Sequence, residues 1–123
     1  MLPWSFVLLL VTTLLGTALA ALHLRGGNTR PPRWPFGALH GLLGIVGLGA
    51  LLIALRGPPR GAAMGVGGFG SIAAVLLAAA LLAGLAVLIV RWRYRRVPGL
   101  VIGIHATIAV SGVVILAAYT LVG

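Results

Sequence analysis

Two histidines lie inside apolar, glycine-containing runs of the chain. Histidine is the residue in these runs that could bind a metal or transfer a proton. The runs read GALHGLLGIVG (residues 37–47) and GIHATIAVSG (residues 103–112). In each run the histidine is followed by a small residue four positions later and by a glycine seven positions later. Ionisable side chains within long apolar segments are rare and usually functional, and neutral imidazole is the commonest metal ligand. The pair His40 and His105 therefore predicts a haem or metal site.

The composition predicts that both runs lie in a membrane. The chain has 123 residues, of which 61% are hydrophobic and 7% are charged, whereas a soluble domain has about 25% charged residues. Four apolar stretches reach the length of about 20 residues that a membrane-spanning helix needs; they are residues 4–24, 36–55, 70–90 and 98–122. We therefore expect an all-α fold, a single up-down bundle of four transmembrane helices. Because each half of the chain contains two spans, we expect the two helical hairpins to have the same orientation in the membrane.

The first of these stretches resembles a secretory signal peptide. It lacks the basic segment that precedes the apolar part of such peptides. We therefore expect it to be retained as the first helix of the bundle.

The distribution of the nine arginines predicts how the bundle is oriented. Seven lie in the first and third connectors (residues 25–35 and 91–97), two lie in the second (residues 56–69), and the chain has no lysine, aspartate or glutamate. By the positive-inside rule, the first and third connectors are cytoplasmic and both ends of the chain are extracytoplasmic, as in a bacterial inner-membrane protein. The aromatic residues expected at the membrane surfaces are Trp34, Trp92 and Tyr94 on the cytoplasmic side and Trp4, Phe69 and Tyr119 on the other. Since the arginines lie at span ends, we expect them to contact lipid headgroups and not nucleic acid.

This orientation places the two histidines at one depth. At 1.5 Å per residue, both lie about 7–11 Å inside the cytoplasmic surface. Their helices are diagonal neighbours in an up-down bundle, with axes about 12–14 Å apart if adjacent axes are about 8–10 Å apart. We expect this gap to suit two imidazoles with a metalloporphyrin between them, and to be too wide for the imidazoles to touch.

Other residues near the histidines fit the same ligand. Positions four and seven residues after a helical residue share its face, so small residues there would leave clearance for a flat ring; they are Gly44, Gly47, Ala109 and Gly112. Arginines at the cytoplasmic end would pair with the two haem propionates; the candidates are Arg30, Arg33, Arg91, Arg95 and Arg96. One haem b per chain with two axial imidazoles is suited to electron transfer.

Two other interpretations of the histidine pair stay open. Small residues at helical spacing are the usual means by which transmembrane helices pack, and a histidine can hydrogen-bond a neighbouring helix. This interpretation predicts a haem-free accessory subunit of a larger membrane complex. The other is a site for a different metal, or a small-solute carrier, in which a third histidine, His23, could take part. At the end of the first span and beside Arg25, His23 is expected to reach the membrane surface or cap its helix, with a propionate or a quinone headgroup as its functional contact.

Residue types that the chain lacks exclude several functions. Without cysteine there are no disulfides, thiolate metal sites or covalent c-type haem. Without carboxylates there is no acidic proton relay and no site of the kind that cation-coupled drug transporters need. The GVGGFG run (residues 65–70) has no preceding strand and no lysine, so we expect a flexible connector and not a nucleotide-binding loop. Hydroxyl residues without a nearby base are expected to hydrogen-bond between helices; they are Thr12, Thr13, Thr17, Thr107 and Ser111.

The runs GALHGLLGIVG and GIHATIAVSG resemble the haem-binding helices of membrane b-type cytochromes, which include the cytochrome b561-like proteins and the core of respiratory cytochrome b. The resemblance implies that His40 and His105 are the axial ligands of one haem in a four-helix bundle. Those families generally hold a second haem with histidines further along the helices, where this chain has Ala54 and Tyr119. The resemblance therefore implies a one-haem relative, an electron-transfer protein or oxidoreductase subunit more than a stand-alone enzyme. One haem near one surface cannot carry electrons across the bilayer, which implies a quinone, a partner membrane subunit or a homo-oligomer.

Overall fold

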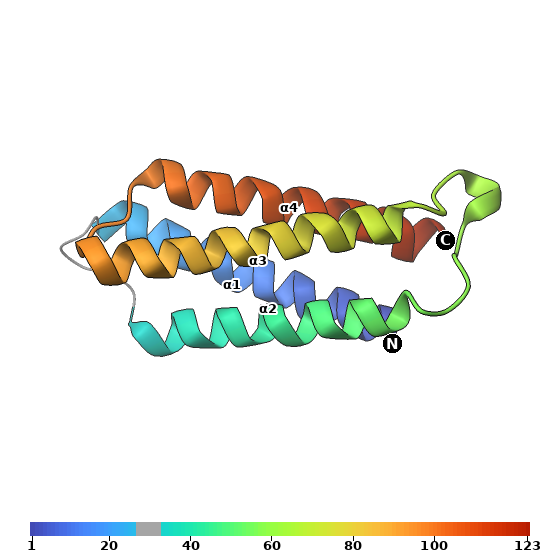
Figure 1. Cartoon of the computed structure of the whole chain (residues 1–123), viewed down its shortest axis with the longest axis horizontal. Helices are drawn as coiled ribbons and strands as arrows, with labels where there is room; N and C mark the ends of the chain where they lie inside the picture. Colours follow the sequence, from blue (N-terminus) through green and yellow to red (C-terminus); the bar gives the residue numbers. More distant parts are fainter. Residues whose placement is uncertain (27–32) are drawn as a thin grey trace.

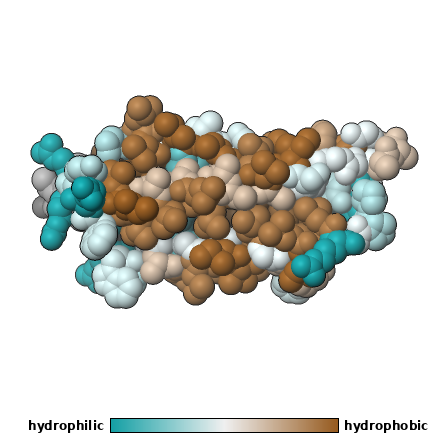
Figure 2. All heavy atoms as spheres, in the orientation of Figure 1, coloured by the Kyte–Doolittle hydropathy of each residue, from teal (hydrophilic) through white to brown (hydrophobic). Residues whose placement is uncertain are grey.

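The described residues form four long helices that pack side by side (Figure 1). The structure is a computed structural model that describes residues 1–26 and 33–123. The helices are α1 (Leu2–Gly26), α2 (Trp34–Ala54), α3 (Phe69–Tyr94) and α4 (Gly99–Val122). Each is long and apolar enough to cross a membrane, and the surface between the two polar ends of the bundle is largely apolar (Figure 2). The predicted all-α, four-span class is confirmed, and the chain is an integral membrane protein.

The helices follow one another around the bundle. Helix α1 packs against α2 and α4, and α3 packs against α4 and α2, so α2 and α4 are diagonal as predicted. The two ends of the chain lie at one end of the bundle, which we call the terminal end (Figure 1). At the opposite end, the arginine end, α1 and α3 finish and α2 and α4 begin; its described arginines are Arg25, Arg33, Arg91, Arg93, Arg95 and Arg96.

The helix boundaries at the arginine end follow from local chemistry. Proline fixes φ near the helical value and lacks an N–H, so it is tolerated in the first turn of a helix. Helix α2 has a proline in its first turn, and Pro98 precedes α4 with an extended backbone. Helix α3 ends where Arg95 takes the left-handed conformation, with φ 56°, and its N–H bonds the Arg91 carbonyl.

The connector between α2 and α3 contains a hydrogen-bonded turn. A 3-10 helix (Ala62–Met64) stands between Gly61 and Gly65, whose φ values are 66° and 76°. Such positive φ values are favourable for glycine because it has no Cβ. The N–H of Val66 donates to the Gly61 carbonyl at 3.1 Å, and the Val66 side chain is buried.

Tyr119 is buried between helices and does not face outward as an aromatic-belt residue would, so its assignment to an aromatic belt was wrong. Its side chain is only 4% exposed. The ring lies over Gly70 of α3, where an added Cβ would come within 2.8 Å of the ring. Its hydroxyl accepts a hydrogen bond from the Arg60 N–H at 3.2 Å. The glycine makes room for the ring, so the tyrosine joins the core.

The two hairpins, α1–α2 and α3–α4, bury equivalent residues. The buried residues of α1 are Leu2, Ser5, Leu9 and Thr12, and 68 positions later α3 buries Gly70, Ala73, Leu77 and Ala80. The buried residues of α2 are Gly47, Leu48 and Leu51, and 65 positions later α4 buries Gly112, Val113 and Leu116. The internal repeat, visible in the sequence only for the second and fourth spans, therefore extends over all four helices.

The buried core fills only the half of the bundle nearest the terminal end. Going toward the arginine end, the last buried residues of α1 and α3 are Thr12 and Ala80, and those of α2 and α4 are Gly47 and Gly112. Beyond them, within the described parts of the four helices, every residue is at least partly exposed. The interior of the half at the arginine end is therefore less completely filled by side chains.

Candidate functional site

The side chains of His40 and His105 meet inside the bundle, at the boundary between its two halves. Each is the seventh residue of its helix, counted from the arginine end. Their ring centroids are 6.0 Å apart and the ring planes are at 89°. The predicted equal depth of the two histidines agrees with this placement, and their rings face each other edge to face across the centre of the bundle. Each imidazole reaches inward from its own helix.

A backbone carbonyl of the neighbouring helix in the same hairpin holds each imidazole. Nδ1 of His40 lies 2.9 Å from the Thr12 carbonyl oxygen, and Nδ1 of His105 lies 2.8 Å from the Ala80 carbonyl oxygen. Because a carbonyl can only accept, Nδ1 carries the proton and donates in both cases. In a neutral imidazole the other nitrogen, Nε2, then has the free lone pair that a metal requires.

Two glycines that the sequence interpretation missed lie directly against the imidazoles. A Cβ added at Gly16 of α1 would lie 2.6 Å from Cε1 of His40, and one added at Gly84 of α3 would lie 3.0 Å from Cε1 of His105. These glycines are 68 positions apart, the same offset as the buried residues of α1 and α3. That offset is the only signal in the sequence that could have pointed to them.

Gly47 and Gly112 do not provide clearance for a ring. A Cβ at Gly47 would lie 2.8 Å from Cγ of Leu9, and one at Gly112 would lie 2.9 Å from Cγ of Leu77. In both hairpins a leucine therefore fills the space above the glycine, and this part of the prediction is corrected. The small residue brings the two helices of a hairpin together, as is usual for transmembrane helices.

The small residues one turn from the histidines also lie within the hairpins. A Cβ at Gly44 would make an ordinary contact of 3.5 Å with the Thr12 methyl group. Its counterpart Ala109 carries such a Cβ and is half-buried. The less filled space is on the other side of the histidines, toward the arginine end.

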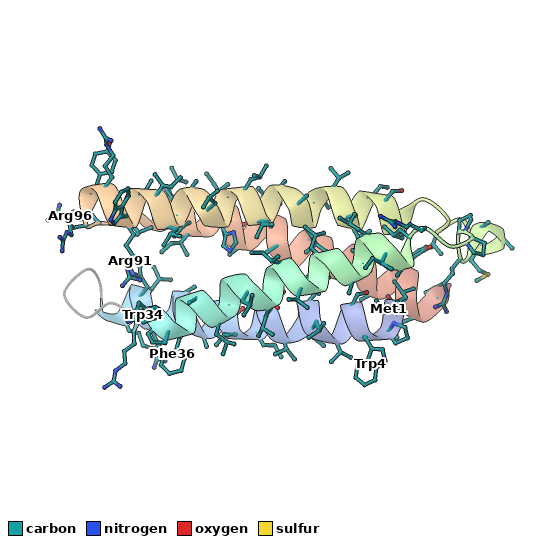
Figure 3. The ribbon with its side chains drawn as sticks, turned by 60° about the horizontal axis from the view of Figure 1, so that its bottom comes forward. Met1, Trp4, Trp34, Phe36, Arg91 and Arg96 are labelled. Atoms are coloured by element: carbon teal, nitrogen blue, oxygen red, sulfur yellow. The ribbon has the colours of Figure 1, made fainter. Side chains whose placement is uncertain are left out.

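The propionate candidates lie at the arginine end, with one outside the described residues. That residue is Arg30. Arg33, Arg95 and Arg96 are exposed, and Arg91 is half-buried. Figure 3 shows Arg91 extending from α3 toward the α1–α2 hairpin, whereas Arg96 points away from the bundle. Of these arginines, Arg91 lies best for a ligand inside the bundle.

His23 is separate from the histidine pair. Its Nε2 lies 3.2 Å from the Val97 carbonyl oxygen, so it donates a hydrogen bond that ties the end of α1 to the connector between α3 and α4. It occupies the position in α1 that Arg91 occupies in α3, 68 residues later. Within residues 1–26 and 33–123, no three metal-ligating side chains come together. A site made by all three histidines is therefore not formed there.

The hydroxyl groups hydrogen-bond within their own helices, and the prediction that they join helices was wrong. Each donates to the carbonyl four residues earlier, at 2.7–2.9 Å; the donors are Thr12, Thr13, Thr17, Thr107 and Ser111. Such local bonds satisfy a hydroxyl in apolar surroundings without a partner on another helix.

A hollow of about 520 Å³ lies on the outer face of α4, away from the histidine rings. It is lined by Gly99, Leu100, Gly103, Ile104, Thr107 and Ile108. Its one polar side chain, Thr107, donates its hydroxyl to the Gly103 carbonyl. The hollow is therefore apolar.

Comparison of the chain with known protein families, with characterised proteins and with solved structures gives no match.

Proposed function

We propose that the chain is a membrane b-type haem protein that holds one haem between His40 and His105 and transfers electrons. The observation that carries this proposal is the geometry of the imidazole pair. Two imidazole nitrogens that bind one metal ion from opposite sides, each about 2 Å from it, would hold their ring centroids about 6 Å apart, and the observed separation is 6.0 Å. Perpendicular ring planes are compatible with this arrangement, because each plane need only contain its own nitrogen–metal bond.

The packing around the pair supports the same proposal. The buried core stops at Thr12 and Ala80, the residues whose carbonyls hold the imidazoles. Beyond them, toward the arginine end, no residue in the described parts of α1 and α3 is fully buried. A large apolar group at this level would make the contacts that side chains do not make there.

The chain would provide orientation, basicity and charge. A haem held by His40 and His105 would supply one-electron exchange. The carbonyls of Thr12 and Ala80 orient the imidazoles and increase the basicity of Nε2, as partners of metal-bound histidines do. Arg91, together with the other arginines that the sequence suggests (Arg30, Arg33, Arg95 and Arg96), would pair with the propionates.

The charge distribution supports a proposed orientation. The arginine end is cytoplasmic and the terminal end is extracytoplasmic, in a bacterial inner membrane. The haem would then lie near the cytoplasmic surface. Because one haem there does not reach the other surface, the electron partner is a membrane-dissolved quinone, another membrane subunit or a second copy of this chain.

The haem proposal is tested by the colour of the protein. The chain is purified in detergent from haem-supplemented cells, and its haem content and reduced-minus-oxidised spectrum are measured. We expect one haem per chain with the sharp Soret and visible bands of a six-coordinate, low-spin haem. His40→Ala and His105→Ala should each lose this spectrum, whereas the matched variant His23→Ala should keep it. A colourless wild-type protein would contradict the proposal.

The orientation needs a separate measurement. A reporter fused after Gly123 should be active only if it is extracytoplasmic, and one inserted after Arg95 should read as cytoplasmic. The opposite pattern would reverse the proposed orientation.

The second candidate is a haem-free accessory subunit of a larger membrane complex. The hollow on α4 favours it, because Gly99, Gly103 and Thr107 follow one another at the four-residue spacing by which transmembrane helices approach closely. A colourless protein that co-purifies with a larger complex would support this candidate.

A further inference from the structure

In both hairpins, a glycine follows by four residues the carbonyl that holds the histidine. Gly16 follows Thr12 in α1, and Gly84 follows Ala80 in α3. The same three-part arrangement, a carbonyl, a glycine one turn later and an imidazole from the neighbouring helix, therefore occurs twice.

The geometry of a helix explains why the glycine matters. A helical side chain covers the turn that precedes its own Cα. A side chain at position 16 or 84 would therefore cover the carbonyl of residue 12 or 80. An added Cβ at Gly16 would also lie 3.2 Å from Nδ1 of His40, and one at Gly84 would lie 3.3 Å from Nδ1 of His105. The imidazole reaches the carbonyl because glycine leaves it uncovered.

Other glycines provide a comparison within the same molecule. At Gly37, Gly41, Gly49 and Gly103, an added Cβ would meet nothing within 4 Å. Among the described glycines, only Gly16 and Gly84 would bring a Cβ against an imidazole. The residues that supply the carbonyls differ, threonine in α1 and alanine in α3, as expected if only their backbone takes part.

We infer that Gly16 and Gly84 are positioning residues that determine which nitrogen each histidine presents. By uncovering a helix carbonyl, each glycine keeps the proton on Nδ1 and leaves Nε2 as the ligand nitrogen. The inference rests on the proposed function only in naming haem as the ligand that Nε2 would bind. The position of the proton, however, is a property of the haem-free protein, so the two claims fail separately.

The proton position can be measured directly. Haem-free protein in detergent micelles, labelled with ¹⁵N-histidine, is studied by NMR at a pH where the imidazoles are neutral. We expect both His40 and His105 to have the proton on Nδ1, whereas an imidazole free in water carries it mostly on Nε2. In Gly16→Ala, His40 should lose this preference and His105 should keep it. In Gly84→Ala, where the added Cβ makes a less close contact, His105 should lose this preference and His40 should keep it.

Three controls separate this effect from general disturbance of the bundle. Gly41→Ala and Gly103→Ala add the same methyl group in open space and should leave both tautomers unchanged. Thr12→Ala removes the side chain but not the carbonyl and should also leave His40 unchanged. A Gly16→Ala or Gly84→Ala protein that keeps Nδ1–H on its own histidine would overturn the inference.

Haem titration supplies the second measurement. Removing the hydrogen-bond partner of a metal-bound histidine usually weakens metal binding about 10–100-fold, and we expect such a loss for Gly16→Ala and Gly84→Ala, with altered visible bands. Should the wild type show the expected tautomers but bind no haem, the proposed function fails while the inference stands. If Gly16→Ala does not fold, Gly84→Ala, whose added Cβ makes the less close contact, tests the inference. Its effect is measured on His105, and His40 is the internal reference.

Discussion

The α1–α2 and α3–α4 hairpins hold the histidines by the same backbone arrangement and differ in several side chains, most of all near the terminal end. In both hairpins a helix carbonyl that a glycine leaves uncovered accepts a hydrogen bond from the imidazole. In both, a leucine also packs on a glycine of the neighbouring helix. Further toward the terminal end, α1 buries Ser5 where α3 buries Ala73, and α2 has Ala54 where α4 has Tyr119. The comparison indicates that the backbone arrangement that positions the imidazoles is the same in both hairpins, although the side chains of the residues that provide it differ.

The largest effect should come from the terminal end, where the hairpins differ most. Tyr119→Ala gives α4 the residue that α2 has at the equivalent position and leaves a cavity over Gly70. Loss of a buried aromatic side chain costs about 3–5 kcal/mol, so we expect the free energy of unfolding in detergent to fall by about that amount. Tyr119→Phe should cost only about 1 kcal/mol, because it removes just the hydrogen bond from the Arg60 N–H. Equal losses in the two variants would contradict the packing role of the ring.

An intermediate and equal effect is expected where the hairpins match. Gly47→Ala and Gly112→Ala add a methyl group against Leu9 and Leu77 at nearly the same distance. Overpacking of this kind costs about 1–3 kcal/mol, and the two losses in unfolding free energy should agree. Both variants should keep the histidine tautomers, since neither touches an imidazole. A large loss in one hairpin alone would break the equivalence of the repeats.

The smallest effect is expected at Gly44. Gly44→Ala places in α2 the residue that α4 carries as Ala109, and the new methyl group would only contact Thr12 at an ordinary distance. We expect the unfolding free energy to change by less than about 0.5 kcal/mol, with haem content equal to that of the wild type. A loss of haem would show that this glycine does provide clearance, and that the two hairpins differ at the site.

Local patterns in the chain account for the helices and for the depth of the histidines. Apolar stretches of spanning length and the lack of acidic residues predict four helices, and the prolines near positions 35 and 98 predict where α2 and α4 begin. These features depend on neighbouring residues alone. The equivalent places of His40 and His105 follow from the same boundaries.

Contacts between helices are not local, and there the sequence interpretation failed. The hydroxyl groups bond within their own helices because a carbonyl four residues earlier is always within reach. Tyr119 is buried because a glycine on another helix makes room for its ring. Neither outcome can be read from the neighbours of these residues in the chain.

The membrane class, the four spans and the paired histidines are therefore properties of the sequence, because hydropathy and helix length act over a single segment. Tertiary structure alone decided that the ring centroids lie 6.0 Å apart, that the carbonyls of Thr12 and Ala80 accept hydrogen bonds from the imidazoles, and that the buried part of α1 and α3 ends at those two residues. The physical reason is the register between antiparallel helices. It determines which carbonyl faces which imidazole, and it is the same in both hairpins: Thr12 and Ala80 are 68 residues apart and face His40 and His105, which are 65 residues apart.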